Sequence, residues 1–412
     1  MATDSLATAQ RSLGDPSATY PLWPPLTQGC PRTSTATVSY PVEVDYAYDR
    51  VPAGLFDRTA GGHGLDRWAP LLPPLAAPGL GEGRTPLVDL GDGVLVKDES
   101  RNPTWSHKDR LNRCAVGAAV ATGAPGVVVA SSGNHGASAA AYAARAGLRC
   151  VVLTSPGAPP AVVSFLHAYG AVVLPVPVEA RRPLLRRISA EYGYHPVSNL
   201  TPTHTGHPFG VEGYKTVAYE IFGDIGVPEA VFVPTGYGEL LFGIGKGFAE
   251  LHRLGLAPAV PRLFSCEPAA GGPLAAAIRR DRPAVTVPVG TTAAYSIACR
   301  VGGYRGVLAL RGSRGEPLLV TDAELATARD ELARAGLWTE LSSAAGLAGL
   351  RQYGAHRFEG PMVCVSTSSG FKDAAVGSLR VAPVAPDWDT VRRRLDEDRP
   401  GPAPLRSPGQ TR

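Results

Sequence analysis

Lysine is scarce in this chain of 412 residues. It occurs only five times, at Lys97, Lys108, Lys215, Lys246 and Lys372, and arginine supplies the rest of the 40 basic residues. Chemistry that needs a lysine amine therefore has five candidate positions.

The chain also lacks a strong charge of one sign, long apolar runs and paired cysteines. The formal net charge is +4, which argues against nucleic acid as the main partner. No run approaches the ~18 to 20 apolar residues of a membrane span, so no membrane partner is expected. The six cysteines form no CxxC pair, which predicts reduced thiols and no metal site. No signal peptide is visible at the N-terminus, so we expect a cytoplasmic protein.

Hydrophobic residues make up 44% of the chain, enough for a large core. From about residue 108, short apolar runs alternate with helical segments, which predicts an α/β fold with parallel strands packed between helices. The predicted strands are 126–132, 150–155, 171–176, 230–236, 262–267 and 362–369. The predicted helices are 108–122, 134–147, 159–169 and 321–336, the last with a capping box from Thr321 to Glu324.

The flanking regions have a different character. Residues 1–60 are expected to form a loosely structured N-terminal arm. A short helix is expected within 62–79, and a hairpin is predicted to turn at 91–93. The Pro- and Arg-rich tail, 384–412, is expected to be partly disordered beyond a short charged helix.

Four segments carry the candidate chemistry. In SSGNHG (131–136) a strand runs into a helix whose free N–H groups suit a carboxylate or phosphate, although an ordinary capped turn would look the same. In PTGYGELL (234–241), Gly236 and Gly238 let the backbone approach an anion closely. The other two are SRNPTWSHKDRLN (100–112), with a lysine at a helix start, and VSTSSGFKD (365–373), with hydroxyl residues at a strand end.

In this order the segments resemble the pyridoxal-phosphate enzymes of fold type II, the tryptophan synthase β family, and within it threonine synthase. The resemblance covers about residues 62 to 378. Its matching segments are LGEGRTPLV (80–88), LVKDESRNPTWSHKDR (95–110), ASSGNHGASAAAYAARAGL (130–148), HPFGVEGYKTVAYEI (207–221), PTGYGELL (234–241) and STSSGFKD (366–373).

The resemblance implies two open, mostly parallel twisted sheets flanked by helices, with the cofactor between two domains. The large, cofactor-binding domain would comprise 61–105 and 206–383, and the small α/β domain 106–205. It also implies pyridoxal 5'-phosphate as cofactor, an amino acid as substrate and a homodimer.

Roles for individual residues follow from the same resemblance. Lys108 would be the catalytic residue, binding the cofactor as a Schiff base and moving protons at Cα, which requires a neutral amine. The cofactor would be held by Asn134 at its 3-oxygen, by Gly236, Tyr237, Gly238 and Glu239 at its phosphate, and by Thr367 at its pyridine nitrogen. The substrate residues would be Thr104, Ser106, Ser132, His135, His204 and Thr205.

The chain departs from the family pattern around this site. Trp105 and His107 replace smaller or apolar residues beside Lys108, and we expect the first to crowd the site and the second to add a group that titrates near neutral pH. The arginine that grips the substrate phosphate in the family is Gly210 here, and the family's loop asparagine is Tyr237. Arg101 or Arg113 could substitute for the arginine.

These observations favour a lyase or synthase that catalyses β- or γ-elimination or replacement, threonine synthase-like but with a divergent substrate site. The alternatives are an authentic threonine synthase acting on O-phosphohomoserine, a serine/threonine dehydratase or diaminopropionate ammonia-lyase, and a non-catalytic homologue. Retention of Lys108 and its surrounding motifs argues against the last.

Overall fold

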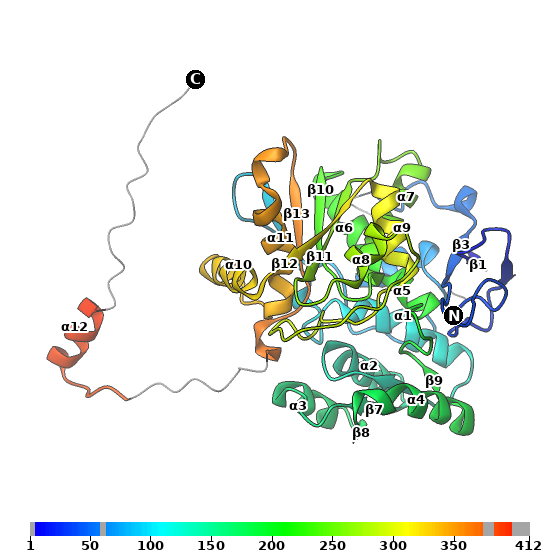
Figure 1. Cartoon of the computed structure of the whole chain (residues 1–412), viewed down its shortest axis with the longest axis horizontal. Helices are drawn as coiled ribbons and strands as arrows, with labels where there is room; N and C mark the ends of the chain where they lie inside the picture. The colour runs from blue at the N-terminus through cyan, green and yellow to red at the C-terminus, as the bar shows by residue number, and fades with distance from the viewer. Residues whose placement is uncertain (1–4, 58–62, 374–382, 398–412) are drawn as a thin grey trace. The chain divides into compact units, whose positions relative to one another are not determined.

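The computed structural model describes residues 5–57, 63–373 and 383–397. The chain divides into two units, 1–374 and 375–412. The second unit contains the short charged helix predicted for the tail, α12 (Trp388–Glu397). All elements discussed below belong to the first unit (Figure 1).

A six-stranded sheet forms the centre of the first unit, in the order β12-β11-β10-β13-β5-β4. Its strands are β4 (Leu87–Asp89), β5 (Val94–Asp98), β10 (Ala230–Pro234), β11 (Arg262–Pro268), β12 (Glu316–Val320) and β13 (Met362–Ser366). All neighbours pair in parallel except β4 and β5, which are antiparallel and form the predicted hairpin. Every residue of β10 and β13 is buried, as expected for strands covered on both faces.

A second sheet has four parallel strands in the order β8-β7-β6-β9. They are β6 (Gly126–Ala130), β7 (Arg149–Thr154), β8 (Val172–Pro175) and β9 (His195–Pro196). Figure 1 shows this sheet and its helices below the six-stranded one. Two open, mostly parallel sheets with flanking helices confirm the predicted fold class.

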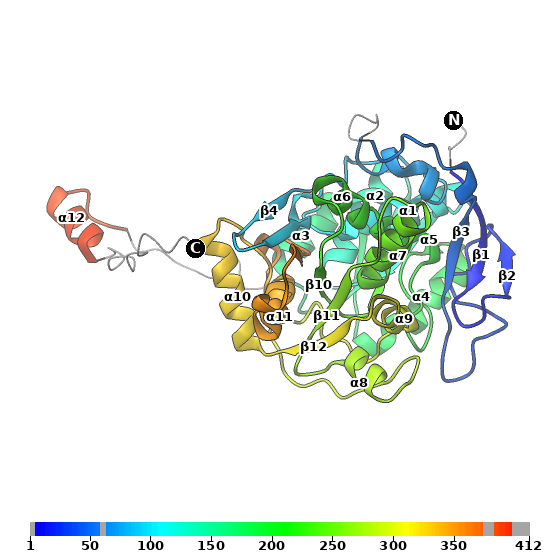
Figure 2. The ribbon, with the colours of Figure 1, turned by 90° about the horizontal axis from the view of Figure 1, so that it is seen from above.

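Residues 7–46 correct the expectation of a loosely structured arm. They contain an antiparallel sheet in the order β2-β1-β3, with β1 (Ala7–Ser12), β2 (Thr19–Pro21) and β3 (Val42–Tyr46). The apolar pattern typical of a buried strand is missing here, because Gln10 in β1 is buried and its amide donates to three backbone carbonyls. Figure 2 shows this sheet at the edge of the molecule, with β3 next to α5 (Pro208–Tyr214).

Helices cover both larger sheets (Figure 2). They are α1 (Lys108–Ala121), α2 (Asn134–Arg145), α3 (Pro160–Ala168), α4 (Val178–Tyr192), α5 (Pro208–Tyr214), α6 (Thr216–Ile225), α7 (Glu239–Arg253), α8 (Pro273–Arg279), α9 (Tyr304–Ser313), α10 (Asp322–Arg334) and α11 (Ala345–Tyr353). The predicted capping box from Thr321 to Glu324 starts α10. The helix expected within 62–79 is a 3₁₀ helix over Gly64–Leu71, with Pro70 near its end.

Candidate active site

Lys108 is the first residue of α1, and its amine faces the end of α5. Its Nζ donates a hydrogen bond to the hydroxyl of Tyr214, 2.9 Å away, and Tyr214 is fully buried. Burial lowers the pKa of Lys108, and the Glu239 carboxylate opposes that shift. The environment therefore shifts the amine toward its neutral form, compared with an exposed lysine. Sequence reasoning missed Tyr214, although it lies in the matched segment 207–221.

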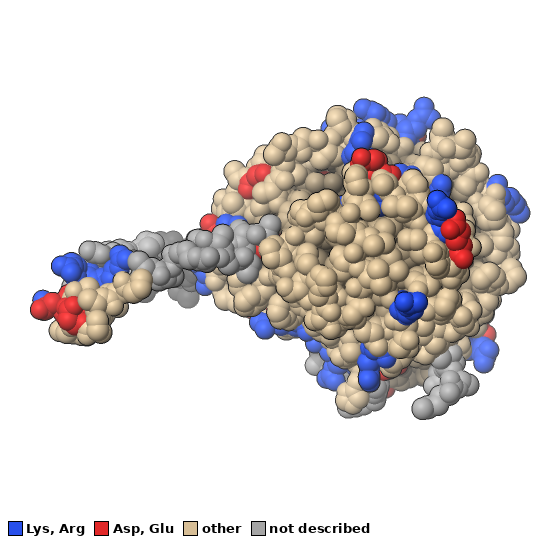
Figure 3. All heavy atoms as spheres, turned by 90° about the horizontal axis from the view of Figure 1, so that it is seen from below, with Lys and Arg blue, Asp and Glu red and all other residues tan. Residues whose placement is uncertain are grey.

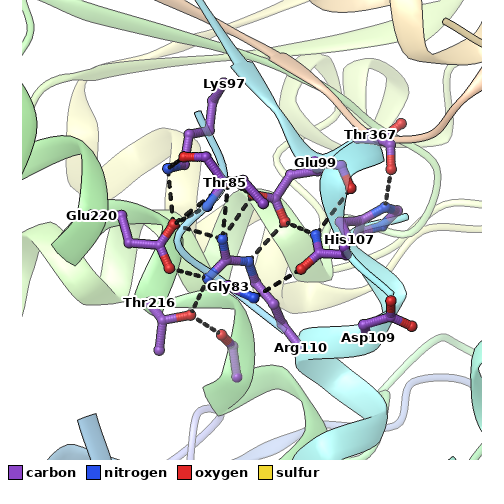
Figure 4. A network of polar contacts seen from close by, with 12 residues as sticks. Gly83, Thr85, Lys97, Glu99, His107, Asp109, Arg110, Thr216, Glu220 and Thr367 are labelled. Carbon is purple, nitrogen blue, oxygen red and sulfur yellow. Dashed lines mark hydrogen bonds and ion pairs between the residues drawn. The ribbon is translucent and has the colours of Figure 1, made fainter. Parts of the chain in front are cut away.

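A buried ionic network fixes the start of α1 (Figure 4). Arg110 donates to Glu99 over 2.7 Å and to Glu220 over 2.6 Å, and Lys97 pairs with the same Glu220 at 2.8 Å. Arg110 lies two residues after Lys108, so the network limits where Lys108 can point. Breaking such a pair by removing one partner is costly, because it leaves an uncompensated buried charge.

His107 and Trp105 behave differently from the expectations above. Nδ1 of His107 donates to the carbonyl of Thr367 over 3.1 Å, and burial lowers the pKa of His107 well below its usual range. His107 is therefore neutral at physiological pH and does not titrate there. The ring of Trp105 lies 5.2 Å from Phe165 and 5.5 Å from Phe371, and Trp105 is 40% exposed. It therefore packs on neighbouring rings rather than filling the space at Lys108.

Trp105 also lines a cavity of about 570 Å³ together with Trp338 and Phe371. Lys108 is not among the residues that line this cavity. The backbone of Trp105 is left-handed, with φ of 61°, a conformation that favours glycine. We attribute no chemistry to the cavity, because it lies beside the site rather than in it.

The segment after β6 brings three expected residues to the start of α2. The amide nitrogen of Asn134 donates to Glu340 over 2.8 Å, and its oxygen accepts from Ser368 over 3.0 Å. The hydroxyl of Ser132 accepts from the backbone N–H of Ser155. No side chain caps α2 within the described residues, so its first N–H groups remain suited to an anion.

His135 is held on both sides of its ring. Nε2 donates to the carbonyl of Val197 over 3.1 Å, and Nδ1 accepts from Asn112 over 3.3 Å. Burial and the charge of Lys108 lower the pKa of His135 to about 4, so it is neutral. Its contact with a substrate carboxylate stays a prediction, because both ring nitrogens are already engaged.

The glycine loop before α7 packs closely against the residues around it. A Cβ on Gly236 would lie 3.0 Å from Sγ of Cys299, and one on Gly238 would lie 2.8 Å from Cα of Gly306. Gly238 also has φ of 87°. In the described part of the chain no side chain caps α7, so its first backbone N–H groups are suited to a phosphate.

The carboxylate of Glu239, the first residue of α7, binds a histidine from the segment before α5. Nε2 of His204 donates to Oε2 of Glu239 over 3.0 Å, and the His204 ring stacks on Tyr237 with centroids 3.9 Å apart. A Cβ on Gly206 would overlap Oε1 of Glu239, so glycine is required there. We call His204, Tyr237 and Glu239 the histidine–glutamate unit.

Of three other expected substrate residues, two have hydroxyls that bind the protein itself. Thr205 is buried, and its hydroxyl contacts Thr201. Thr104 is also buried, and its hydroxyl donates to Asp109 over 2.5 Å. The hydroxyl of Ser106 is buried and finds no hydrogen-bond partner within the described residues. Of these three, Ser106 is therefore the one whose hydroxyl remains available to a ligand.

Thr367 follows β13, at the carboxyl edge of the six-stranded sheet. Its hydroxyl lies 2.8 Å from that of Ser343, and the residue is 6% exposed. Its carbonyl accepts from His107, the residue before Lys108, so it is tied to the segment that carries Lys108. The geometry thus joins Thr367 to Lys108 through one residue.

Position 210, where the family pattern places an arginine, is a closely packed glycine here. A Cβ on Gly210 would lie 2.9 Å from Leu111. Arg101 and Arg113, which could substitute for this arginine, both already pair with carboxylates. Arg113 is buried and binds Asp66 and Glu82, and Arg101 pairs with Asp98 at 3.0 Å.

Residues 79–370 match the family described as "Pyridoxal-phosphate dependent enzyme". The chain belongs to this family. Threonine synthase of Mycobacterium tuberculosis is 31% identical over 368 residues, which cover 84% of this chain and 94% of that protein. Threonine synthase of Halalkalibacterium halodurans is 34% identical over 324 residues, which cover 74% and 87%. The predicted resemblance to threonine synthase is therefore confirmed.

Solved structures agree on the fold. Maize serine racemase superposes with a TM-score of 0.63 at 20% identity, covering 76% of this chain and 93% of that one. A threonine deaminase from tomato (Solanum lycopersicum) gives 0.61 at 17% identity, covering 76% and 83%. At these identities the likeness concerns the fold alone.

The site fits pyridoxal 5'-phosphate, the cofactor of this family. The glycine loop and the uncapped start of α7 suit its phosphate, and Lys108 with its lowered pKa suits its aldehyde carbon. No cluster of His, Cys, Asp or Glu within the described residues could hold a metal ion. The six cysteines are free and buried.

The surface carries no concentrated charge on the face shown in Figure 3, where basic and acidic side chains are scattered. Among the described residues, no helix is long and apolar enough to cross a membrane. The chain is a pyridoxal-phosphate dependent enzyme.

Proposed function

We propose that this enzyme catalyses β- or γ-elimination or replacement on an amino acid, with a substrate site that has diverged from that for O-phosphohomoserine. The observation that carries the proposal is Lys108, whose amine donates to Tyr214 and whose pKa is lowered by desolvation. A neutral amine can take a proton from Cα and return it.

The cofactor, when bound, supplies the electron sink that makes the Cα proton removable. The residues of the chain would hold the cofactor and bind the substrate. The uncapped start of α7 and the loop from Gly236 to Gly238 would bind the cofactor phosphate, and Asn134 and Thr367 would orient its ring. The start of α2, with Ser132, would bind the substrate carboxylate.

In a β-elimination, Lys108 takes the Cα proton, and the bond from Cβ to the leaving group breaks with its electron pair going to that group. A leaving oxygen receives the proton from Lys108, whereas an ammonium group departs as ammonia without one. In a β-replacement, the incoming nucleophile adds at Cβ and gives up its proton, and a proton returns to Cα. In a γ-reaction, a second proton leaves Cβ and the bond from Cγ to the leaving group breaks with its electron pair going to that group.

An authentic threonine synthase is the second candidate. It is supported by the 31% identity to threonine synthase of Mycobacterium tuberculosis over 84% of this chain. Divergence is supported by the close packing at Gly210, where a Cβ would lie 2.9 Å from Leu111, and by the existing ion pairs of Arg113.

The first experiment tests the cofactor site. Purified protein should show an absorbance band that borohydride reduction abolishes and that Lys108→Ala lacks. Lys372→Met is a matched control, because Lys372 lies in another motif of the family and should not affect the band. A wild-type protein that takes up no cofactor would refute the proposal.

The second experiment divides the candidate reactions. O-Phosphohomoserine, O-phosphoserine, serine, threonine and 2,3-diaminopropionate are incubated with the holoenzyme, and the products are identified by NMR. Rapid threonine formation from O-phosphohomoserine would establish the second candidate. A keto acid and ammonia from one of the other amino acids would support the first.

We also propose that the enzyme is a cytoplasmic homodimer, as the family resemblance implies. Light scattering on the purified holoenzyme should then give a mass of about twice the 42.9 kDa of one chain.

A further inference from the structure

The cavity of about 570 Å³ beside the site has no part in the proposed reaction. It lies at the carboxyl ends of β5 and β13, where Asp98 and Ser366 end the two strands. Its volume is within the range of pockets that bind small molecules, and open α/β sheets bind ligands at this edge. Lys108 does not line the cavity, so a molecule bound there would be held rather than transformed.

Three large aromatic side chains line the cavity and are only half-buried. Trp105, Trp338 and Phe371 are 40%, 48% and 51% exposed. The ring centroids of Trp338 and Phe371 lie 4.4 Å apart, and those of Trp105 and Phe371 lie 5.5 Å apart. The rings therefore form one contiguous apolar surface. Such a surface favours a ligand with a flat ring that can pack against it.

Trp105 contributes its ring from a strained backbone. Its φ is 61°, a conformation in which a bulky side chain is rare. Its N–H donates to the carbonyl of Asn102 over 2.8 Å, and its carbonyl accepts from the hydroxyl of Ser368 and the N–H of Ser369, each over 3.1 Å. Glycine adopts this conformation without strain. Strain that the surroundings enforce is concentrated at functional sites, so the indole at this position points to a ligand.

The acidic side chain that lines the cavity is already satisfied. Oδ1 of Asp98 accepts from the N–H and the hydroxyl of Ser100 over 3.1 and 2.5 Å, and Oδ2 accepts from Nε of Arg101 over 3.0 Å. The Asp98 side chain is 5% exposed. It therefore offers little to a cationic ligand.

Donors that line the cavity remain available. Arg101 uses Nε for Asp98, and its two terminal nitrogens have no hydrogen-bond partner among the described residues. They can bind an anion as a fork. The hydroxyl of Ser369 accepts from the N–H of Phe371 over 3.3 Å, which leaves its own hydrogen to donate. Guanidinium and indole N–H groups can only donate, so the cavity is complementary to a ligand that accepts hydrogen bonds.

We propose that this cavity is a second ligand site, for a small molecule that combines a planar aromatic ring with an anionic group. The ring would pack on Trp105, Trp338 and Phe371, and the anion would bind the guanidinium of Arg101. An aromatic carboxylate and a nucleotide phosphate share this chemistry. The site is separate from that at Lys108, so it goes beyond the proposed reaction and does not depend on it.

Calorimetry on the cofactor-saturated enzyme tests the ligand class. Indole-3-acetate represents the aromatic carboxylates, adenosine 5'-monophosphate the nucleotides, and tryptamine is a cation with the same ring as the first. At least one of the two anions should bind about tenfold more tightly than tryptamine, because the free charge in the cavity is positive. The proposal is wrong if neither anion binds, or if tryptamine binds as tightly as both.

Variants test whether the anion lies in the cavity. Arg101→Gln should weaken binding of the anion about tenfold and leave tryptamine unaffected. Trp338→Ala should weaken both compounds about tenfold, because it removes part of the aromatic surface. Trp105→Gly should do the same from another segment, and glycine fits the backbone there.

Two matched controls come from α4. Arg187 and Tyr192 are exposed there and do not line the cavity. Arg187→Gln and Tyr192→Ala should therefore bind the anion as the wild type does. An anion whose affinity responds to neither Arg101→Gln nor the two tryptophan variants binds elsewhere, and that result would refute the site.

Two further readouts identify other outcomes. The cofactor band is recorded for each protein, and an enzyme that binds the anion but shows no band would overturn the proposed function while supporting this site. Light scattering gives the mass of each variant. If neither anion binds and Trp338→Ala turns a dimer into a monomer, a second copy of the chain covers the cavity and the ligand site is wrong.

Discussion

The contact between Lys108 and Tyr214 is the smallest unit on which the chemistry depends. Tyr214 ends α5, and its buried hydroxyl accepts from the amine of Lys108 over 2.9 Å. The ring of His107 lies 5.5 Å from that of Tyr214 and completes the wall beside the amine. The hydroxyl therefore sets the direction of the amine.

Tyr214→Phe tests this contact. Loss of one hydrogen bond to a group that becomes charged costs about 1.5–3 kcal/mol, so kcat should fall about 10- to 100-fold. The hydroxyl stabilises the ammonium form, so its loss should lower the pKa of Lys108 further and shift the pH dependence of cofactor uptake downward. Tyr353→Phe is the control, because its hydroxyl contacts Arg262. An unchanged pH dependence in Tyr214→Phe would contradict this role.

At the scale of elements, the start of α1 is positioned by charges from other segments. Glu99 follows β5, Glu220 lies in α6, and Arg110 joins both from α1. All three side chains are buried, and Arg110 also reaches Thr216 of α6 (Figure 4). The network connects three segments that are far apart in the sequence.

Arg110→Lys should weaken this connection. Lysine keeps the charge but cannot bind two carboxylates with a planar fork, so we expect a loss of stability on the order of 3 kcal/mol. Denaturant unfolding measures it. Arg187→Lys is the matched control, since Arg187 forms an exposed ion pair with Glu191 and should leave the midpoint unchanged. Equal midpoints for the two variants would show that the network is not a stabilising connection.

A second buried network joins the N-terminal sheet to the helices. Glu212 of α5 binds Lys215 over 2.9 Å and Lys246 of α7 over 2.8 Å, and Lys246 also reaches Glu43 of β3. Burial would raise the pKa of Glu212, but the two lysines lower it to about 2.

This shift predicts a pH dependence of stability. Between about pH 4.5 and 2 the unfolded chain binds a proton at Glu212 that the folded chain does not, so the contribution is complete above pH 4.5 and is lost as the pH falls toward 2. The contribution at neutral pH is about 3 kcal/mol. Unfolding of Glu212→Gln and wild type, compared at several pH values, should give a difference that shrinks over this range. A constant difference would exclude the assignment.

At the scale of the whole molecule, the N-terminal sheet belongs to the folded unit. The amine of Lys215 lies 3.8 Å from the ring centroid of Tyr46 in β3, and the carbonyl of Val44 accepts a hydrogen bond from Lys246. Two buried lysines thus find partners in residues that precede the matched family region, 79–370.

Deletion of residues 1–47 should therefore destabilise the enzyme strongly. It would remove Glu43, Val44 and Tyr46 and leave Lys215 and Lys246 with fewer partners in a low-dielectric environment. Soluble yield and the thermal midpoint measure the effect, with removal of residues 398–412 as the control truncation. A deletion of 1–47 that matched the control in both would show that the sheet is dispensable.

The order of elements from residue 108 onward followed from the sequence. All six strands predicted between 126 and 369 occur, because buried parallel strands are continuous apolar runs such as those of β10 and β13. The N-terminal sheet escaped prediction because its strands pair antiparallel and bury polar residues such as Gln10. A periodicity argument does not detect such strands.

The family, the cofactor and the candidate lysine can be predicted from the sequence alone, because they depend on short segments in a set order. The surroundings of that lysine depend on the fold. Tyr214, Glu239 and Glu340 come from α5, α7 and the segment before α11, and only folding brings them to Lys108 and Asn134. The structure also shows that His107 is neutral and that Gly210 is closely packed, since burial and packing depend on neighbours distant in sequence.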